Sequence, residues 1–422
     1  MKKDQTRKQP IVLFMGCSFG TEDALKYAKS KGIYTIITAN ELPVNGDLVK
    51  MADEFWQIDV GDVDLLEKKC RQKQVTGLFA ATSEFCLDKT KVLCKRLHLP
   101  FYASDEGWAC ARDKKRFRKH CIKCGLDVPR SYQTESVMEC EINYPVIVKP
   151  VDSCAQQGTS ICRNKDELQK GIAYAMTYSA SQNVLIEEYI EGDELAVMYY
   201  FVDGKPVPVE IVDMIYMQVN GRKNFTFVKQ DSRYKEEYLK DISPKVEKLF
   251  EHMKCENGVA FVQIIRKSGR YYFLELGYRI NGGGSWEITK KFSGISSVEF
   301  MVDCALGHKY RIHLDSQTDL NPMHKAGGMY LIWSRPGRIG KIEGLDEINR
   351  IDDIKITIQN FKAGDEIPKD ISMRQIAFFV AVVADSNIEL QKKISEINKT
   401  LHIYDRESND MLYYLKDFEN FE

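Results

Sequence analysis

The sequence has no long apolar run, since no stretch approaches the roughly 18 residues that a membrane-spanning helix requires. The N-terminal segment MKKDQTRKQP is too polar for a signal peptide, so we expect a cytoplasmic protein without membrane contact. An excess of one charge is also missing, because 60 basic and 61 acidic residues give a formal net charge of -1. Nucleic acid is therefore not expected as a partner.

Metal-binding, nucleophile and dinucleotide patterns are equally scarce. The 12 cysteines are scattered, and the close pair Cys121 and Cys124 lacks a second CxxC or a histidine pair to complete a zinc site. Cysteines near glycine-rich turns have no visible partner among the seven histidines, so thiol catalysis is not expected. The turn GCSFG at residues 16–20 departs from G-x-G-x-x-G, which argues against dinucleotide binding.

A length of 422 residues exceeds one typical core and predicts two or three domains. The first hundred residues alternate apolar strands with amphipathic helices, which predicts βαβ units and a parallel sheet of about four strands. We expect these strands at residues 11–15, 33–38, 55–58 and 76–80. Helices are expected up to about residue 31 and at residues 62–73 and 85–97.

The pattern changes near Asp113, where the basic helix DKKRFRKHCIKCG begins, so a second domain is expected over residues 113–329. Within it, short strands and a helix predict a small subdomain at about 125–190. Residues 220–240 are polar and aromatic without clear periodicity and predict a loop. A last block, 330–422, predicts a small α+β cap. The expected fold class is thus multidomain α/β and α+β, beginning with a parallel-sheet domain at residues 1–112.

One predicted hairpin carries polar side chains to a glycine run. The segment VQIIRKSGRYYFLELGYRINGGG, from Val262, gives two apolar strands that contain Gln263 and Glu275. A carboxylate in such a strand is costly unless a cation neutralises it, and either Arg279 or a bound metal would serve. A structural ion pair between Glu275 and Arg279 is the alternative without chemistry.

Two further segments suggest a nucleotide site without a Walker sequence. Lys149 ends the apolar strand YPVIVK beside a polar turn whose amides could contact phosphate oxygens. In VLIEEYIEGDEL, an apolar strand stops at two acids and turns onto Glu194, so it could offer backbone groups to a base and a carboxylate to a ribose. A solvated lysine and a plain strand-turn-strand are the alternatives.

In this order, these motifs resemble the ATP-grasp superfamily from about residue 10 to the end. The resemblance implies a parallel-sheet domain before an ATP-grasp fold, with ATP and Mg²⁺, or Mn²⁺, as cofactors. It implies that ATP is bound by Lys114, Lys149, Ser153, Gly158, Glu187, Tyr189, Ile190 and Glu194. It implies a metal at Glu275, Gln263 and Asn281, and a substrate contacted by Arg279, Gly282 and Gly283, with Arg279 as the catalytic residue that meets an acyl phosphate.

The sequence departs from the family pattern at two points. Ala155 and Gln156 stand where the phosphate loop usually has small Gly and Ser residues, and Gly277 stands where many members have an asparagine at the metal. The C-terminal motifs WSRPGRIGKIEGLDEI, FKAGDEI and IAFFVAVVADS resemble the L-amino-acid ligase group, which also accepts Glu-x-Gly-x-Arg near the metal.

The resemblance implies an ATP-dependent carboxylate-amine ligase that acts on a small amino-acid-like acid and an amine, through an acyl phosphate. The alternatives are a carbamoyl-phosphate-synthetase-like or purine-pathway ligase, and a regulatory protein that binds ATP without turnover. A homodimer is the expected assembly, as the commonest oligomeric state.

Overall fold

The computed structural model describes residues 9–41, 47–134, 137, 141–151, 157–202, 204–219, 222–307, 324–369, 373–418 and 421. Ser153, Ala155 and Gln156, three residues of the expected phosphate loop, lie outside these ranges. Within the described ranges, no helix has both the length and the apolar character needed to span a membrane.

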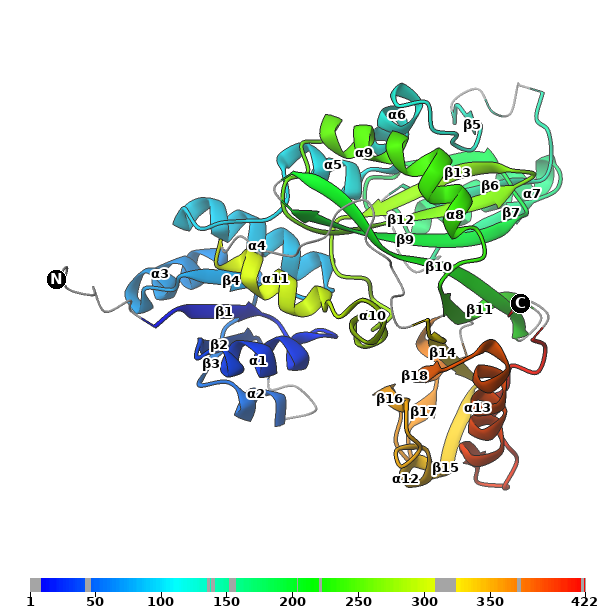
Figure 1. Ribbon diagram of the computed structural model, residues 1–422. Coiled ribbons are helices and arrows are strands. Elements are labelled where there is room, and N and C mark those ends of the chain that lie inside the picture. The colour runs from blue at the N-terminus through cyan, green and yellow to red at the C-terminus, as the bar shows by residue number, and fades with distance from the viewer. Residues whose placement is uncertain are drawn as a thin grey trace.

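The N-terminal unit is a four-stranded parallel sheet with the order β3-β2-β1-β4 (Figure 1). The expected alternation of strands and helices is confirmed, with boundaries shifted by at most a few residues. The strands are β1 (Ile11–Met15), β2 (Tyr34–Ala39), β3 (Glu54–Gln57) and β4 (Gly77–Phe79). The helices are α1 (Thr21–Ser30), α2 (Asp47–Met51), α3 (Val63–Lys73) and α4 (Glu84–Leu97).

Two short helices lead from this unit to the rest of the chain. Ser104 caps α5 (Asp105–Arg112) by accepting a hydrogen bond from the Gly107 N–H. Asp113 caps α6 (Lys114–Lys123) by accepting from the backbone N–H groups of the second and third residues of the helix. This cap fixes where α6 begins, and it therefore fixes the position of Lys114.

A small antiparallel sheet with the order β5-β8-β6-β7 follows, covered by one helix. The strands are β5 (Ser131–Tyr132), β6 (Val146–Pro150), β7 (Ser160–Cys162) and β8 (Val184–Glu188), and the helix is α7 (Lys165–Thr177). Apolar side chains from the strands and the helix form a separate small core, including Val146, Val148, Leu168 and Ile186. In the antiparallel β6–β8 pair, Ile147 lies opposite Glu187, and Lys149 lies two residues further along β6.

A nine-stranded sheet forms the centre of the molecule, with the order β13-β12-β9-β10-β11-β14-β18-β16 and with β20 paired to β14. Its first five strands in sequence order are β9 (Asp193–Val202), β10 (Lys205–Val219), β11 (Arg222–Gln230), β12 (Gly258–Lys267) and β13 (Arg270–Gly277). The β12–β13 hairpin confirms the sequence-based expectation. The loop expected at residues 220–240 was wrong, because β11 pairs with β10 on one side and with β14 on the other.

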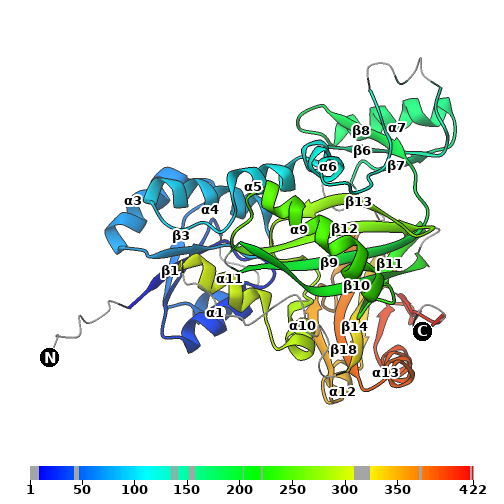
Figure 2. The same ribbon diagram turned by 45° about the horizontal axis from the view of Figure 1, so that its top comes forward.

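Helices cover both faces of this sheet (Figure 2). The segment after β11 forms α8 (Lys235–Glu237), a π-helical turn (Tyr238–Ile242) and α9 (Ser243–His252). Helices α5 and α6 contact β13, α9 contacts β10, and α6 also contacts α9. After β13 come α10 (Trp286–Ser293), which contacts β10, β14 and β18, and α11 (Ser297–Ala305), which packs against α1 and β4 of the N-terminal unit.

The C-terminal block continues the central sheet instead of folding beside it. Strands β14 (Ala326–Ser334), β16 (Ile354–Gln359), β18 (Ile376–Ala384) and β20 (Leu412–Tyr413) all join it. A three-stranded sheet is formed by β15 (Gly337–Glu343), β17 (Glu366–Ile367) and β19 (His402–Asp405). The remaining helices are α12 (Leu345–Ile348), a 3₁₀ turn (Met373–Gln375) and α13 (Asn387–Thr400). The expected limit at residue 330 falls inside β14, and the domain limits as such stay predictions.

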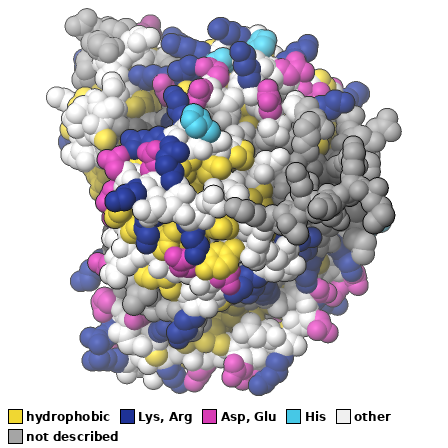
Figure 3. All heavy atoms as spheres, turned by 90° about the vertical axis from the view of Figure 1, so that its left-hand side faces the viewer, with side chains coloured by type: hydrophobic (Ala, Val, Ile, Leu, Met, Phe, Trp, Pro, Cys, Tyr) yellow, Lys and Arg dark blue, Asp and Glu magenta, His cyan; other side chains and the backbone are white. Residues whose placement is uncertain are grey.

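The surface at the N-terminal end of the molecule mixes both charge signs. Figure 3 shows Lys and Arg side chains interspersed with Asp and Glu side chains over this face. This distribution agrees with the nearly balanced composition, and it argues against electrostatic attraction of a polyanionic polymer to this face.

Candidate active site

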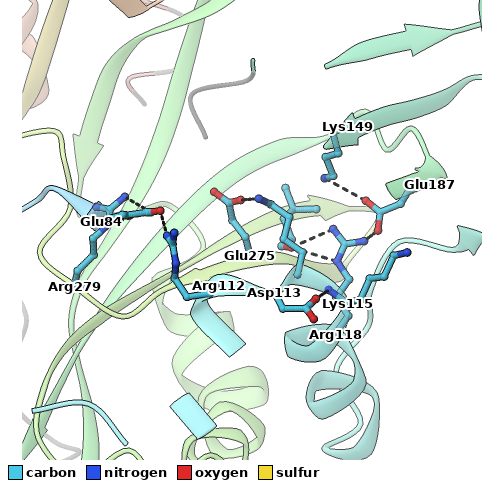
Figure 4. Close-up of polar contacts among 11 residues, drawn as sticks. Glu84, Arg112, Asp113, Lys115, Arg118, Lys149, Glu187, Glu275 and Arg279 are labelled. Carbon is cyan, nitrogen blue, oxygen red and sulfur yellow. Dashed lines mark hydrogen bonds and ion pairs between the residues drawn. The ribbon is translucent and has the colours of Figure 1, made fainter. Parts of the chain in front are cut away.

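Three basic side chains that are far apart in the sequence each pair with an acid (Figure 4). The Lys149–Glu187 pair lies in the small sheet, whereas Arg279 pairs with Glu84 of the N-terminal unit. Lys114 is the first residue of α6, Lys149 lies on β6, and Arg279 follows β13. The two lysines had been expected to bind ATP, and Arg279 had been expected to contact the acyl phosphate. For Arg279, the acid partner is Glu84 and not Glu275, which the sequence had suggested as its partner.

Lys114 pairs with Glu275, with 3.0 Å between Nζ and Oε2. Burial opposes ionisation of Glu275, but Lys114, Lys149 and Arg279 outweigh it and lower the pKa of this carboxyl group. Glu275 is therefore ionised at neutral pH. The expected alternative, a direct ion pair of Glu275 with Arg279, is wrong, because the direct partner of Glu275 is Lys114.

Glu187 lies fully buried on β8 between two cations. Lys149 approaches it with 3.1 Å between Nζ and Oε2, and Arg118 from α6 contacts its other oxygen. Arg118 is only 4% exposed and also donates two hydrogen bonds to the Leu274 carbonyl oxygen, at 3.2 and 3.1 Å. One carboxylate thus holds two positive charges, so one of them is left without a full counter-charge.

Lys149 is the cation whose charged form is disfavoured by this imbalance. Burial, reinforced by the positive charge of Arg118, lowers the pKa of Lys149 to about 7. Burial also lowers the pKa of Arg118, to about 10, so this guanidinium stays charged at neutral pH. A polyanion next to Lys149 would supply the missing negative charge, which makes this a good position for a phosphate group.

Arg279 pairs with an acid of the N-terminal unit. Its Nη2 lies 3.2 Å from Oε1 of Glu84, in the first turn of α4, and its Nη1 donates to the Ile280 carbonyl oxygen at 2.9 Å. Glu84 also contacts Arg112, at the end of α5. The arginine side chain is 18% exposed, and its two partners, Glu84 and the Ile280 carbonyl oxygen, fix its orientation. This contact brings the N-terminal unit into the site.

The residues expected around the adenosine lie where β8 leads into β9. Glu194 is mostly buried and accepts a hydrogen bond from the Tyr216 hydroxyl group. Burial raises the pKa of Glu194 despite this hydrogen bond. The Tyr189 N–H donates to the Pro145 carbonyl oxygen at 3.0 Å, so this hinge donor is engaged within the small sheet. Ile190 is buried, as an apolar wall for a base requires.

Gly158 supports a tight turn next to the expected phosphate loop. Its φ is +72°, and an added Cβ would lie 2.8 Å from Pro150 and 2.9 Å from Tyr178. Any side chain would therefore clash as well as strain the backbone. The turn requires glycine for packing, and its contact with phosphate stays a prediction.

The residues expected at a metal supply only oxygen donors. Gln263 and Glu275 are directly opposite each other in the antiparallel β12–β13 pair, so both side chains lie on one face. The Oδ1 atom of Asn281 is buried and has no hydrogen-bond partner among the described residues. One carboxylate and two amide oxygens are hard ligands that suit Mg²⁺. These residues therefore fit a magnesium ion.

Beside them, the loop Gly282–Gly283 leaves room for a ligand. A Cβ atom added at either glycine would meet no heavy atom within 4 Å. Neither glycine is therefore required by the packing of the described chain. Contact of these glycines with a substrate stays a prediction.

Sequence reasoning missed three residues that the structure brings to this site, namely Arg118, Glu84 and Arg112. Arg118 follows Lys114 by one helical turn on α6, and this spacing was an available signal. Glu84 is 195 residues from Arg279, and no local pattern announces such a contact.

Comparison with known families identifies the central part of the chain. Residues 142–287 match the family described as the ATP-grasp domain. The match begins before β6 and ends at the start of α10, and it includes Lys149, Glu187, Glu275 and Arg279. The resemblance to the ATP-grasp superfamily expected from the sequence is therefore confirmed for residues 142–287.

Similar proteins and structures extend this result. The carbamoyl phosphate synthase large chain of Archaeoglobus fulgidus is 27% identical over 212 residues, which are 47% of this chain and 19% of that protein. Dapdiamide A synthase of Enterobacter agglomerans is 21% identical over 354 residues, 80% of this chain and 82% of that protein. The crystal structure of an L-amino acid ligase from Bacillus licheniformis has a TM-score of 0.78 at 20% identity, covering 94% of this chain and 98% of that one.

These similarities differ in extent. The chain spans less than a third of the carbamoyl phosphate synthase large chains that it matches, from 17% to 29% of their length. It spans most of the dapdiamide synthase and of the L-amino acid ligase. The structural similarity confirms the expected fold, with a parallel-sheet unit before the ATP-grasp domain.

Proposed function

We propose that this protein is an ATP-dependent carboxylate-amine ligase that forms an amide or peptide bond through an acyl phosphate. The observation that carries the proposal is the convergence of Lys114, Lys149 and Arg279, each held by an acid from another element. Three oriented cations beside an open glycine loop suit the transfer of a phosphoryl group.

In the proposed complex, Lys149 and Lys114 contact the phosphates of ATP. Ile190 and the backbone at Tyr189 adjoin the base, and Glu194 accepts hydrogen bonds from the ribose. Glu187, expected as an acid beside the base of ATP, also keeps Lys149 oriented from its buried position. Ser153 and Gly158 belong to the loop that covers the phosphates. The basis for these roles is the match to the ATP-grasp domain together with the burial and charge of each side chain.

Glu275, Gln263 and Asn281 would hold Mg²⁺, with Mn²⁺ as a substitute. When bound, the metal would neutralise charge on the phosphate oxygens. The unpartnered Oδ1 atom of Asn281 is the structural observation that supports its inclusion in this set.

The chemistry needs two steps. A carboxylate oxygen of the substrate attacks the γ-phosphorus of ATP, and the bond from this phosphorus to the bridging oxygen of ADP breaks. The amine then attacks the acyl carbon, the bond from carbon to the phosphate oxygen breaks, and the amine loses one proton. Arg279 stabilises the negative charge on the acyl phosphate, while Gly282 and Gly283 leave space for it.

A small amino-acid-like acid is the proposed substrate. Support comes from the two similar proteins that are covered over most of their length, which are named as an L-amino acid ligase and a dapdiamide A synthase. The carbamoyl phosphate synthases favour a second candidate, a ligase of that type or of the purine pathway. A regulatory ATP-binding protein is the candidate from another class.

Phosphate release in the presence of pooled amino acids tests the proposal. We expect ATP and Mg²⁺ to give phosphate only with a substrate pool, together with a product mass equal to two components minus water. Arg279→Ala should bind ATP and release no phosphate. Tight ATP binding without phosphate from any pool would refute the ligase and favour the regulatory candidate.

Lys149→Ala tests the site itself. We expect it to weaken ATP binding strongly, whereas the matched change Lys170→Ala, at an exposed position of α7, should leave the affinity unchanged. Equal ATP affinity in the two variants would remove Lys149 from the nucleotide site.

A further inference from the structure

A buried carboxyl group lies below the glycine loop and has no part in the proposed chemistry. Glu210, on β10, is 5% exposed. Among the described residues, its hydrogen-bond partners are all neutral: Gln230 Nε2 at 2.5 Å, Thr289 Oγ1 at 2.9 Å and Ser285 Oγ at 3.3 Å. A buried acid with neutral partners is costly to ionise, so its presence calls for a reason.

The partners of Glu210 lead to Asn281. Ser285 immediately precedes α10, but its side chain makes no capping hydrogen bond. Its hydroxyl group donates to Glu210 Oε2 and accepts from Asn281 Nδ2 at 2.8 Å. Since the hydroxyl proton is used toward Glu210, only an N–H donor fits on the other side of Ser285. The carboxamide of Asn281 is thereby fixed, with Nδ2 toward Ser285 and Oδ1 facing away.

The hydrogen bonds around Thr289 require Glu210 to be protonated if all of them are to form. The Thr289 hydroxyl group has a single proton, yet it lies 2.9 Å from both Glu210 Oε2 and the Ser285 carbonyl oxygen. A protonated Glu210 can donate to Thr289 Oγ1, which then donates to the carbonyl oxygen. Burial raises the pKa of Glu210, in agreement with a neutral acid at this position.

We infer that Glu210 is a positioning residue of the proposed ligase site, which acts through Ser285 to hold Asn281 Oδ1 as a fixed acceptor for a cationic group. This inference rests on the proposed function for the identity of that group, which is either the divalent metal or an ammonium group of the substrate. The observation behind it is the buried Oδ1 atom, which has no partner among the described residues.

The variant Glu210→Gln isolates this effect. A glutamine keeps an oxygen for Gln230 and an N–H donor for Thr289, as the neutral acid does, and it has nearly the same shape. It presents an N–H group where Ser285 needs an acceptor, so the Ser285 hydroxyl proton is no longer held toward position 210. This proton can then turn toward Asn281, whose carboxamide loses its fixed orientation. Ser285→Ala removes the same link from the other end. Ser293→Ala, which deletes a hydroxyl bonded to the Thr289 carbonyl oxygen in the same helix, is the matched control.

The first measurement does not depend on catalysis. In protein labelled with ¹⁵N-asparagine, we expect the side-chain amide protons of Asn281 to exchange slowly with solvent. Glu210→Gln and Ser285→Ala should speed this exchange about tenfold, as the loss of one hydrogen bond implies, and Ser293→Ala should not. Exchange that is unchanged in both test variants would refute the relay.

The second measurement asks what Asn281 binds. Ser285→Ala should lower kcat/KM about tenfold with unchanged ATP affinity, and it should have no further effect in an Asn281→Ala background. A weaker apparent affinity for Mg²⁺ would identify the metal as the cationic group, and a higher KM for the amine would identify the ammonium. An equal loss in both backgrounds would refute the inference. If the wild-type protein releases no phosphate, the proposed function fails while the exchange measurement still decides the relay.

Discussion

The proton balance of ATP binding gives a sharp test of the role of Lys149. Burial and the neighbouring Arg118 lower the pKa of Lys149 to about 7, so in the free protein about half of this side chain is uncharged at neutral pH. A triphosphate favours the charged ammonium and raises its pKa again. ATP binding should therefore take up a proton, and the affinity should fall as the pH rises above about 7.

The size of the effect follows from the charged fraction. Raising the pH from about 7 to about 8.5 lowers the charged fraction of Lys149 from about one half to about 0.03, so the dissociation constant of ATP should rise about 15-fold. This change corresponds to about 1.6 kcal/mol. Calorimetric titrations in buffers with different ionisation enthalpies measure the affinity and the proton uptake together.

Lys149→Arg is the control, because a guanidinium stays charged over this range and leaves only the titration of ATP and of other groups. The wild type should show a steeper loss of affinity and a larger proton uptake than this variant. Identical pH profiles for the two proteins would refute the assignment of a titrating Lys149 to the phosphate site.

Three other predictions address the remaining contacts of the site. Glu187→Gln leaves two buried cations without their carboxylate, so hydrogen exchange at β6 and β8 should show a loss of about 3 kcal/mol, and unchanged exchange would contradict this. Asp113→Ala removes the cap of α6 and should lower the stability of this helix by about 1 kcal/mol, measured by hydrogen exchange at α6. Asp113→Asn keeps a capping oxygen and should lower it by less. Glu84→Gln should lower kcat/KM with unchanged ATP affinity, because Arg279 loses its charged partner, and normal turnover would rule out this positioning role.

Local patterns predicted the parts of the fold that depend on neighbours in the sequence. The β12–β13 hairpin follows from two apolar runs around a Lys-Ser-Gly turn, and the N-terminal parallel sheet follows from alternating strands and helices. The strand β11 was missed because its sequence RKNFTFVKQ mixes polar and aromatic residues. Its place between β10 and β14 is decided by long-range pairing, which no local window contains.

In the candidate site, too, local patterns predicted single residues but not the long-range contacts between them. Lys149 and Glu275 were expected because each stands at the end of a strand or within one, whereas Lys114 and Glu187 were expected from the resemblance to the ATP-grasp superfamily. Their pairing was not predictable, since it depends on how α6, the small sheet and the hairpin pack together. The partner expected for Glu275 was the nearby Arg279, but the packing gives it Lys114 instead.

The pairing of every expected phosphate-binding cation with an acid bears on how the site works. Lys114, Lys149 and Arg279 would repel one another if they converged without counter-charges, and the acids keep them oriented in the free protein. In the proposed complex, the triphosphate would supply new negative charge to the lysines, and Glu275 would then be available to hold the metal. Glu187 cannot follow, because it is buried between Lys149 and Arg118 and has no access to solvent. Of the two acids, Glu275 would thus be released from its ion pair when ATP binds, whereas Glu187 would stay paired. The difference in burial distinguishes an acid proposed to take part in the chemistry from an acid that keeps the cations in position.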